Sequence, residues 1–508
     1  MPIAFAAAFL LLGIVTRDWY GVSWDEPLHR QWGEIAWAYL VTGNEQLLER
    51  MEGGGQFYGP LYYMLNYGVS QVARNVPGVY TAAANHLLTL VTASAGVLCT
   101  GLLAHKLFGR TTAIAALTLL CLLPPFLAHA HYNPKDLPLA TLVVACLLFA
   151  ASAYRVIAKR DALLAGVFFG LAVAMKPSAL VLVPIIGGAV AADALVRRPL
   201  DVAALMRLVA IAAVGAATGL VVGWPTLLRR PDMLLGSIRY FASGQFWDGE
   251  VLYFGTLTTA TELPWHYAPV MLAMSIPVVS LALAGVGAAL AARRAVTRHA
   301  VFEHTLLLLW VALPLAMFMK PGLARYDGMR QLFFVVPALA ILGGIGWAAF
   351  WQLGDRSRGA RRLVVTSAAA AVAWLVAENA RVFPYGGSYV SEPARVAFGP
   401  HIERRFEVEY WGVTYREGMR WLQQHADRSS VVCAPVASQI LPWQQVLFWQ
   451  PETARDDLTY ECGSGARYVM LMTRFAEWPS EYRPLLATGP AFTVSRLGSD
   501  LLYVYDTR

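Results

Sequence analysis

Charged residues are scarce in this chain of 508 residues, which excludes an ordinary soluble protein. Asp, Glu, Lys and Arg make up 14% of it, whereas soluble domains average about 25%. Hydrophobic residues make up 57% and gather in runs separated by short basic clusters, as in a chain that crosses a bilayer repeatedly. The sequence also lacks a C-x-x-C pair, a Walker loop and a G-x-G-x-x-G turn after a strand, so nothing supports soluble nucleotide chemistry.

Cysteine is nearly as rare, and its five positions follow no metal-binding spacing. Three of them, Cys99, Cys121 and Cys146, lie in apolar runs, where a cysteine acts as a small hydrophobe. The other two, Cys433 and Cys462, fall in the polar tail, where an oxidising compartment permits a disulfide. Two buried free thiols are the alternative.

The hydrophobic runs predict eleven membrane crossings. Their expected bounds are 3–16, 81–104, 111–128, 137–157, 162–175, 178–195, 207–226, 267–292, 304–320, 331–351 and 363–380. The first run is short and has no basic segment before it, so either the true start lies upstream or the helix is trimmed.

The net charge of +7 does not indicate a nucleic-acid partner, because the excess lies in loops between crossings. Basic clusters occur at 105–110, 155–160, 197–207, 293–298 and 356–362, in alternate loops. The positive-inside rule places all five in the cytoplasm. The N-terminus is then inside and the tail outside.

Two features shape the predicted outer side. Segment 17–80 contains two amphipathic stretches opening at Pro27 and Pro60, which we expect to form helices on the membrane surface. The apolar region 162–195 is broken at Lys176–Pro177, because proline disfavours helix at the residue before it. Two helices meeting at an external turn are therefore expected there.

From residue 382 the composition becomes polar, and strand-like runs at 430–434, 467–473 and 501–505 follow a helical pattern at 415–425. We predict a polytopic α-helical membrane domain over 1–381 and a small soluble α/β domain over 382–508.

The first candidate for chemistry is the acidic pair Asp25 and Glu26, just outside the first crossing. Adjacent carboxylates ahead of a surface helix can accept a proton from a hydroxyl or hold a cation. Alternatively, Glu26 caps the helix that Pro27 opens, and the helix dipole favours Asp25. Spacing alone leaves both readings open.

Several cations fall on the predicted outer side, where topology does not require positive charge. They are Lys135 in Asn133–Pro134–Lys135–Asp136, Lys176 at the helix break, Lys320, and both arginines of Arg325–Tyr326–Asp327–Gly328–Met329–Arg330–Gln331. Such groups suit phosphate oxygens. The structural alternatives are a turn in which Asp136 caps the next helix, snorkelling of Lys176, and interfacial anchoring of the arginines.

Five short motifs resemble those of a known class. They are Trp24–Asp25–Glu26–Pro27–x–His29, Tyr58–Gly59–Pro60–Leu61, Asn133–Pro134–Lys135–Asp136, Arg325–Tyr326–Asp327–Gly328–x–Arg330–Gln331 and Phe406–Glu407–Val408–Glu409–Tyr410–Trp411–Gly412–Val413–Thr414–Tyr415–Arg416–Glu417. With the long first external loop, they look like the membrane-embedded GT-C glycosyltransferases. The nearest branch is that of protein O-mannosyltransferases and aminoarabinose transferases (glycosyltransferase family 39-like). The tail departs from the sugar-binding module of eukaryotic O-mannosyltransferases, which leaves a protein acceptor in doubt.

The resemblance implies transfer of a monosaccharide from a polyprenyl-phosphate donor to an acceptor hydroxyl by an inverting displacement. The expected setting is the outer face of a bacterial inner membrane, with the tail in the periplasm. Partners are the lipid-linked donor, an unknown protein, lipid or glycan acceptor and membrane lipids, with no nucleic acid.

Within that reading the catalytic pair is Asp25 and Glu26, with Asp25 as the base. The expected donor-binding residues are Lys135, Lys176, Arg325, Tyr326 and Arg330, together with His29, which either orients the carboxylate or is structural. No cofactor is expected, and a divalent metal is not predicted because the cations carry the phosphate charge.

Two other classes stay open. A transporter or flippase of lipid-linked sugars would need polar residues near the bilayer midplane, whereas the interior positions are mostly Ala, Leu, Val and Gly. A non-catalytic membrane scaffold is the third reading.

Overall fold

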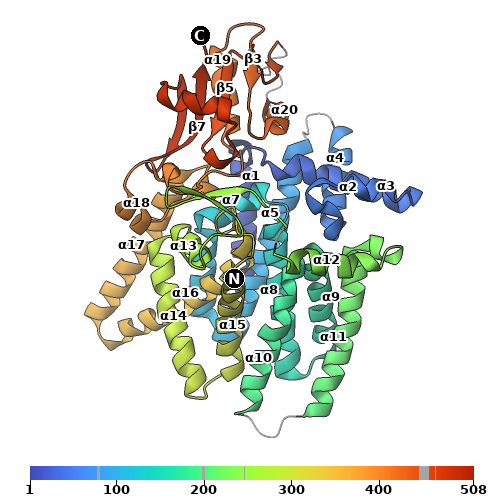
Figure 1. Ribbon diagram of the computed structural model, residues 1–508. Coiled ribbons are helices and arrows are strands. Elements are labelled where there is room, and N and C mark those ends of the chain that lie inside the picture. The colour runs from blue at the N-terminus through green and yellow to red at the C-terminus, as the bar shows by residue number, and fades with distance from the viewer. Residues whose placement is uncertain (77–80, 197–200, 245, 446–456, 464) are drawn as a thin grey trace.

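The computed structural model describes residues 1–76, 81–196, 201–244, 246–445, 457–463 and 465–508. It shows a helical bundle with a small mixed sheet at one end, and a group of short helices beside that same end (Figure 1).

Nine segments of the described chain are long and apolar enough to cross a membrane. They are α1 with the turn after it (Pro2–Trp19), α5 (Thr81–Phe108), α8 (Asp136–Val156), α10 with the turn before it (Pro177–Ala194), α11 (Val202–Gly223), α14 (Val278–Val296), α15 (Val301–Phe318), α16 with its flanking turns (Arg330–Arg356) and α17 (Arg358–Val382). The chain is thus a multi-pass α-helical membrane protein, as the hydrophobic runs predicted.

The other two predicted crossings differ from single long helices. The run at 111–128 forms α6 (Arg110–Cys121) and α7 (Pro124–Tyr132), which are bent by 64° at the break before two consecutive prolines. The run at 162–175 forms α9 (Lys159–Met175), which with 17 residues is shorter than the nine.

The predicted crossing at 267–292 begins too early. The chain there forms a short helix α13 (Tyr267–Met274), and α14 begins only after Pro277. Proline has no amide hydrogen to donate and restricts the residue before it, so the helix does not continue through Ile276.

Small residues allow α9 and α11 to pack closely. A Cβ atom added at Gly170 of α9 would lie 2.1 Å from the carbonyl oxygen of Ala216 in α11, and one at Gly219 of α11 would lie 2.1 Å from that of Val167. Backbones this close gain van der Waals contact and need small residues, as in the small-xxx-small packing of membrane helices.

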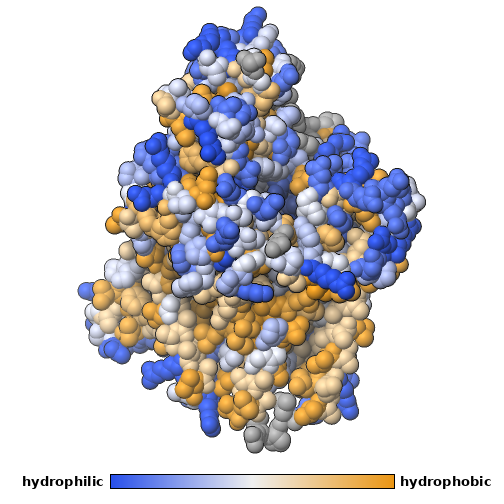
Figure 2. Space-filling view, viewed as in Figure 1, coloured by the Kyte–Doolittle hydropathy of each residue, from blue (hydrophilic) through white to orange (hydrophobic). Residues whose placement is uncertain are grey.

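The two ends of the bundle differ in their loops. The C-terminal end of α10, the N-terminal end of α11 and the turn between α14 and α15 lie far from the sheet (Figure 1). Figure 2 shows hydrophobic residues over the flank of the bundle and more hydrophilic residues around the sheet and the short helices. The basic residues at 293–298 therefore lie opposite the sheet, as the charge pattern requires.

Both predicted amphipathic helices are present beside the sheet-side end. They are α2 (Asp25–Thr42) and α4 (Leu61–Arg74), with the short α3 (Gln46–Glu49) between them. A Cβ atom at Gly33 of α2 would lie 2.0 Å from the carbonyl oxygen of Tyr63 in α4, so the two helices touch at this glycine. The predicted break after α9 is also present, with Lys176 in extended backbone before the turn at Pro177–Val181.

The C-terminal region contains α19 (Tyr415–His425) and a five-stranded sheet of order β4-β3-β5-β7-β6. The strands are β3 (Val431–Cys433), β4 (Thr459–Tyr460), β5 (Tyr468–Met472), β6 (Phe492–Arg496) and β7 (Ser499–Asp506). Strand β3 pairs in parallel with β4 and β5, and the other pairs are antiparallel. The three predicted strands and the helix are confirmed, and a disulfide joins Cys433 to Cys462.

The bundle has a large hydrophobic core of its own, and a second hydrophobic core joins the bundle to the sheet. This second core includes Ala128 and Tyr132 of α7, Trp411 and, on β7, Val504. A hairpin of β1 (Glu250–Tyr253) and β2 (Thr256–Thr259), which the sequence did not predict, also contributes. The division of the chain at 381/382 stays a prediction, since this core continues across it.

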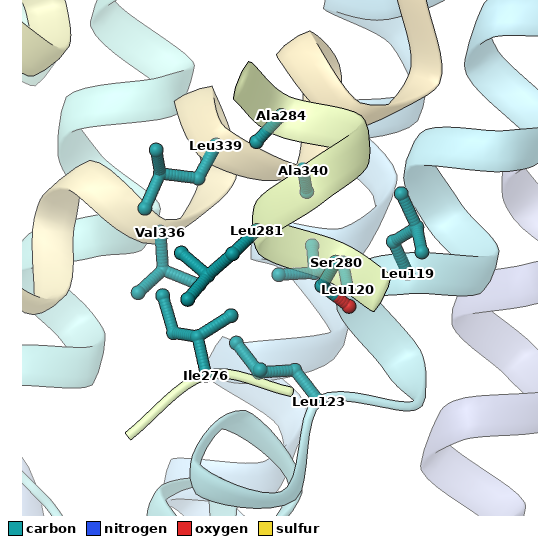
Figure 3. A pocket seen from close by; sticks show the side chains of 10 residues that line it. All are labelled: Leu119, Leu120, Leu123, Ile276, Ser280, Leu281, Ala284, Val336, Leu339 and Ala340. Carbon is teal, nitrogen blue, oxygen red and sulfur yellow. The ribbon is translucent and has the colours of Figure 1, made fainter. Parts of the chain in front are cut away.

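A small void opens between α6, α14 and α16 (Figure 3). It measures about 20 Å³, and its lining side chains are apolar except for Ser280. A void of this size holds about one water, so it is not a substrate site.

Candidate active site

One arginine gathers three carboxylates from distant parts of the chain. Arg330 donates through Nη2 to Asp25 Oδ2, through Nε to Asp136 Oδ2 at 3.0 Å and through Nη1 to Asp327 Oδ2 at 2.7 Å. The Trp411 ring covers the guanidinium, with 4.5 Å from Cζ to the ring centroid. This cluster lies where the bundle meets the C-terminal region, on the outer side predicted from charge.

Lys176 belongs to the same cluster. Its Nζ lies 3.0 Å from Asp136 Oδ1, so Asp136 is held by one cation on each oxygen. The helix break at Pro177 permits this contact, because it ends α9 and turns Lys176 toward the start of α8. Asp136 therefore does more than cap a helix: it joins two cations that the sequence places 154 residues apart.

Lys135 has a different environment. Its Nζ lies 3.7 Å from the centroid of the Tyr58 ring and 5.6 Å from that of Trp32. Within the described part of the chain its ammonium makes no hydrogen bond or ion pair. Burial, and then the charge of Lys176, lower the pKa of Lys135 to about 7. Lys135 is therefore only partly charged near neutral pH, and an anionic ligand beside it would favour the ammonium form.

Asp25 and Glu26 point to different partners. Burial alone would raise the pKa of Asp25, but the Arg330 guanidinium, aided by His29 and Lys135, lowers it to about 2. Glu26 Oε2 instead accepts a 2.6 Å hydrogen bond from the Ser23 amide, and Oε1 lies 3.0 Å from His86 Nε2 of α5. Asp25 therefore faces the cluster, whereas Glu26 binds the Ser23 amide just before its own helix and lies beside His86.

His29 lies among aromatic rings one helical turn after Asp25. It stacks on Tyr63 with 4.7 Å between ring centroids and lies 5.0 Å from Trp32. Burial is the main cause that lowers its pKa to about 3, so the imidazole is neutral. The contacts of the described residues include no hydrogen bond between His29 and the Asp25 carboxylate.

Arg325 binds the backbone rather than the carboxylates of the cluster. Its guanidinium donates to the backbone carbonyls of four residues, and its side chain is fully buried. These acceptors are Leu263, Pro264, Phe318 and Leu323. Arg325 therefore fixes the turn before α13 to the segment after α15. Arg330 lies five positions further along the chain, far enough for the two guanidinium groups to have different partners.

Tyr326 lies next to the cluster. Its ring packs on Trp247 with 4.5 Å between centroids, and burial raises the pKa of its hydroxyl. It stays a candidate for substrate contact.

Sequence reasoning missed several members of the site. Asp327, Glu407 and Trp411 lay inside quoted motifs without a role, and Arg474 lay in none. Arg474 Nη2 is 3.0 Å from Asp327 Oδ1, and its Nε is 3.3 Å from Glu407 Oε1. An arginine directly after a strand-like run was the one available signal, and a sequence does not name its distant partners.

Among the described residues, one group of metal-ligand side chains lies outside this cluster. His401, Glu403 and Asp500 bring ligand atoms within 4.8 Å of one another beside β7. Glu403 already accepts from the Asp500 amide, and Asp500 from the Tyr503 hydroxyl. These internal bonds account for the grouping.

No family model and no curated protein matches the chain. Among solved structures, the arrangement of helices is similar to that of ArnT from Cupriavidus metallidurans in the apo state. The identity is 15%, the TM-score is 0.53, and the match covers 99% of this chain and 97% of that one. A structure of the same protein bound to undecaprenyl phosphate gives 15% identity, the same coverage and a TM-score of 0.51.

The fold is therefore that of the GT-C membrane glycosyltransferases, which confirms the fold implied by the resemblance. ArnT from Cupriavidus metallidurans shares this fold along almost its whole length. At this identity the likeness concerns the fold, and the chemistry must be argued from the site.

Proposed function

We propose that the protein transfers a monosaccharide from a polyprenyl-phosphate donor to an acceptor hydroxyl. The observation that carries this proposal is the Asp25–Arg330 pair beside Lys135, a buried cation without an anionic partner among the described residues. A carboxylate beside cations at the membrane surface matches a reaction that removes a proton and releases a lipid phosphate. The ArnT structure with undecaprenyl phosphate supports the choice of donor class.

The donor phosphate is proposed to bind Lys135 and Arg330. A phosphate at Arg330 competes with Asp25 for the guanidinium, and its negative charge raises the pKa of Asp25. A carboxylate with a pKa of about 2 is a weak base, so donor binding makes Asp25 a better base at the moment when one is needed. Lys176 acts through Asp136, which it holds against Arg330.

The chemical step is a single displacement. The acceptor oxygen forms a bond to the anomeric carbon while Asp25 accepts its proton, and the bond from that carbon to the phosphate oxygen breaks. The electron pair leaves with the lipid phosphate, whose charge Lys135 and Arg330 offset. Attack opposite the leaving group inverts the anomeric centre. The cations of the chain carry the phosphate charge in this scheme, and no metal is assigned.

The proposed location is a bacterial inner membrane, with residues 382–508 as a periplasmic domain and 1–381 as the membrane domain. The Cys433–Cys462 disulfide supports an oxidising compartment for the sheet. The basic turn between α14 and α15 lies at the opposite end, as expected for the cytoplasmic side.

The test is transfer by the purified full-length protein in lipid nanodiscs, with lipid-linked sugars extracted from a strain that lacks the gene. Release of free polyprenyl phosphate together with a sugar-modified acceptor is the expected result. Movement of the intact lipid-linked sugar across a vesicle bilayer without its consumption would instead support the flippase. Folded protein that consumes none of the extracted donors contradicts the proposal.

A further inference from the structure

Arg474 reaches the ion cluster from the C-terminal sheet. It follows β5 by two residues, and its side chain is 7% exposed. Besides Asp327 and Glu407, its guanidinium lies near two tryptophans, with Cζ 5.2 Å from the Trp24 ring centroid and 5.9 Å from that of Trp247. Trp24 directly precedes Asp25 in the chain, so Arg474 contacts both sides of the Asp25–Arg330 pair.

The charges around Arg330 are shared unequally. Of its three carboxylates, Asp136 has Lys176 as a second cation and Asp327 has Arg474. Asp25 has an ion pair with Arg330 alone among the described residues. Because the other two carboxylates are each half satisfied from elsewhere, the positive charge of Arg330 stays available to Asp25.

The same contacts hold the backbone at Asp25. The Trp24 amide donates a 2.8 Å hydrogen bond to the Trp411 carbonyl, and the Trp411 ring covers Arg330. The C-terminal region thus contacts the chain before Asp25 through Trp411 and Arg474. Trp411 also covers Arg330, and Arg474 is linked to Arg330 through Asp327, which both arginines bind.

We propose that Arg474 is a positioning residue, which holds Asp327 from the C-terminal sheet and so keeps Arg330 directed at Asp25 and at the donor phosphate. This inference rests on the proposed function for its role in transfer, although the contact itself does not. Without Arg474, the Asp327 carboxylate has Arg330 as its cation. Less of the charge of Arg330 is then available to Asp25, and the net negative charge near Asp25 increases. The pKa of Asp25 then rises.

Other charged groups lie near Asp25 and Arg474 and affect the expected pKa change of Asp25. Those that act electrostatically on Asp25 are Arg330, His29 and Lys135. Those around Arg474 are Asp327, Glu407, Glu477 and Arg330. Burial, opposed by Arg474, raises the pKa of Glu407 to about 7, so Glu407→Gln is needed to separate its titration from that of Asp25.

The experiment measures the protonation of Asp25 directly. Purified full-length protein is treated with a carbodiimide, which reacts with protonated carboxyl groups, over a pH series, and labelling of Asp25 is quantified by mass spectrometry. Arg474→Gln should raise the labelling midpoint by about one pH unit, and Arg474→Lys, which keeps the charge but loses the fork, by about half as much. Glu407→Gln should leave the upward shift of Arg474→Gln in place.

The matched control is Arg496→Gln. Arg496 also joins the sheet to the rest of the chain, through Glu417 at 3.2 Å and the Phe383 carbonyl at 3.2 Å, but it does not contact Asp327. The labelling midpoint of Asp25 in Arg496→Gln should equal that in the wild type. If Arg474→Gln fails to insert, Arg474→Lys decides by itself. An unchanged Asp25 midpoint in a folded Arg474 variant, or an equal shift in Arg496→Gln, overturns the proposal.

Labelling does not depend on turnover, so it tests the contact even if the wild type transfers no sugar. If the wild type does transfer, Arg474→Gln should lower kcat about tenfold near neutral pH, because Arg330 is then directed less well at the donor phosphate and this loss exceeds any gain from the raised pKa of Asp25. The acid limb of kcat/KM should move upward, with partial rescue by Arg474→Lys. Loss of stability alone would lower the amount of active protein without moving that limb.

Discussion

Arg325 in its turn and Arg330 in the ion cluster lie five positions apart in the chain, yet their guanidinium groups bind different kinds of partner. Arg325 donates to neutral backbone carbonyls, whereas Arg330 donates to three carboxylates. An arginine bound to backbone carbonyls fixes the path of the chain. An arginine bound to carboxylates belongs to an ion network, which an incoming anion can rearrange, and such a network suits a substrate-binding site. The role of a basic residue in a motif therefore depends on the groups that accept its hydrogen bonds.

The largest expected effect lies in the cluster. Asp25→Asn keeps the shape of the side chain but removes the basic oxygen, so transfer should fall by about two to four orders of magnitude. Turnover of the purified variant measures this, and donor binding with a normal melting temperature shows that the fold survives. Near-normal turnover in a well-folded variant would falsify the assignment of Asp25 as the base.

Lys135→Gln should weaken donor binding by roughly ten- to hundredfold, because a charge-assisted phosphate contact is worth about 1.5–3 kcal/mol. Since the pKa of Lys135 lies at about 7, the ammonium loses its proton as pH rises through that value. Donor affinity of the wild type should therefore fall above neutral pH, and that of the variant should be flat. Lys320→Gln removes an exposed cation on the same side and is the control. Equal losses of donor affinity in both variants would indicate that the donor responds to the overall positive charge of this side and not to a specific contact with Lys135.

Arg325→Gln should cost stability and leave the donor KM within about threefold of the wild type. Lost hydrogen bonds to buried carbonyls lower the free energy of unfolding by about 1–3 kcal/mol. Thermal unfolding and donor titration separate the two effects, with Arg330→Gln as the paired variant that should lose donor affinity. A large rise in donor KM for Arg325→Gln at unchanged stability would erase the contrast between the two arginines.

The smallest effect is expected for Glu26→Gln. The amide oxygen can still accept from the Ser23 amide, so the change should cost about 1 kcal/mol of stability and little turnover. Melting temperature and transfer rate are measured beside those of Asp25→Asn. A loss of turnover as severe as that of Asp25→Asn would place Glu26 in the chemistry as well.

Much of the fold could be predicted because hydrophobic runs and proline positions act locally. The break at Lys176–Pro177, the helix at 415–425 and the strand β5 follow from such signals. The bend between α6 and α7 was missed although Pro124 and Pro125 mark it, because a continuous apolar run was given more weight than the prolines.

The site was predicted less completely. Asp25, Lys135, Lys176 and Arg330 come together as a set of charges. Arg325 binds backbone carbonyls instead, and the sequence could not separate the two arginines because they look alike in one motif. Arg474 carried no signal that named Asp327, which lies 147 residues earlier.

The sequence by itself determined a membrane protein with an acidic pair outside its first crossing, because apolar length and charge asymmetry act on each segment separately. Only the tertiary structure decided which acid faces Arg330, which arginine binds backbone and which lysine has no anionic partner among the described residues. Those outcomes depend on distances between segments hundreds of residues apart. Electrostatic energy depends on such distances and on burial, and a local pattern contains neither.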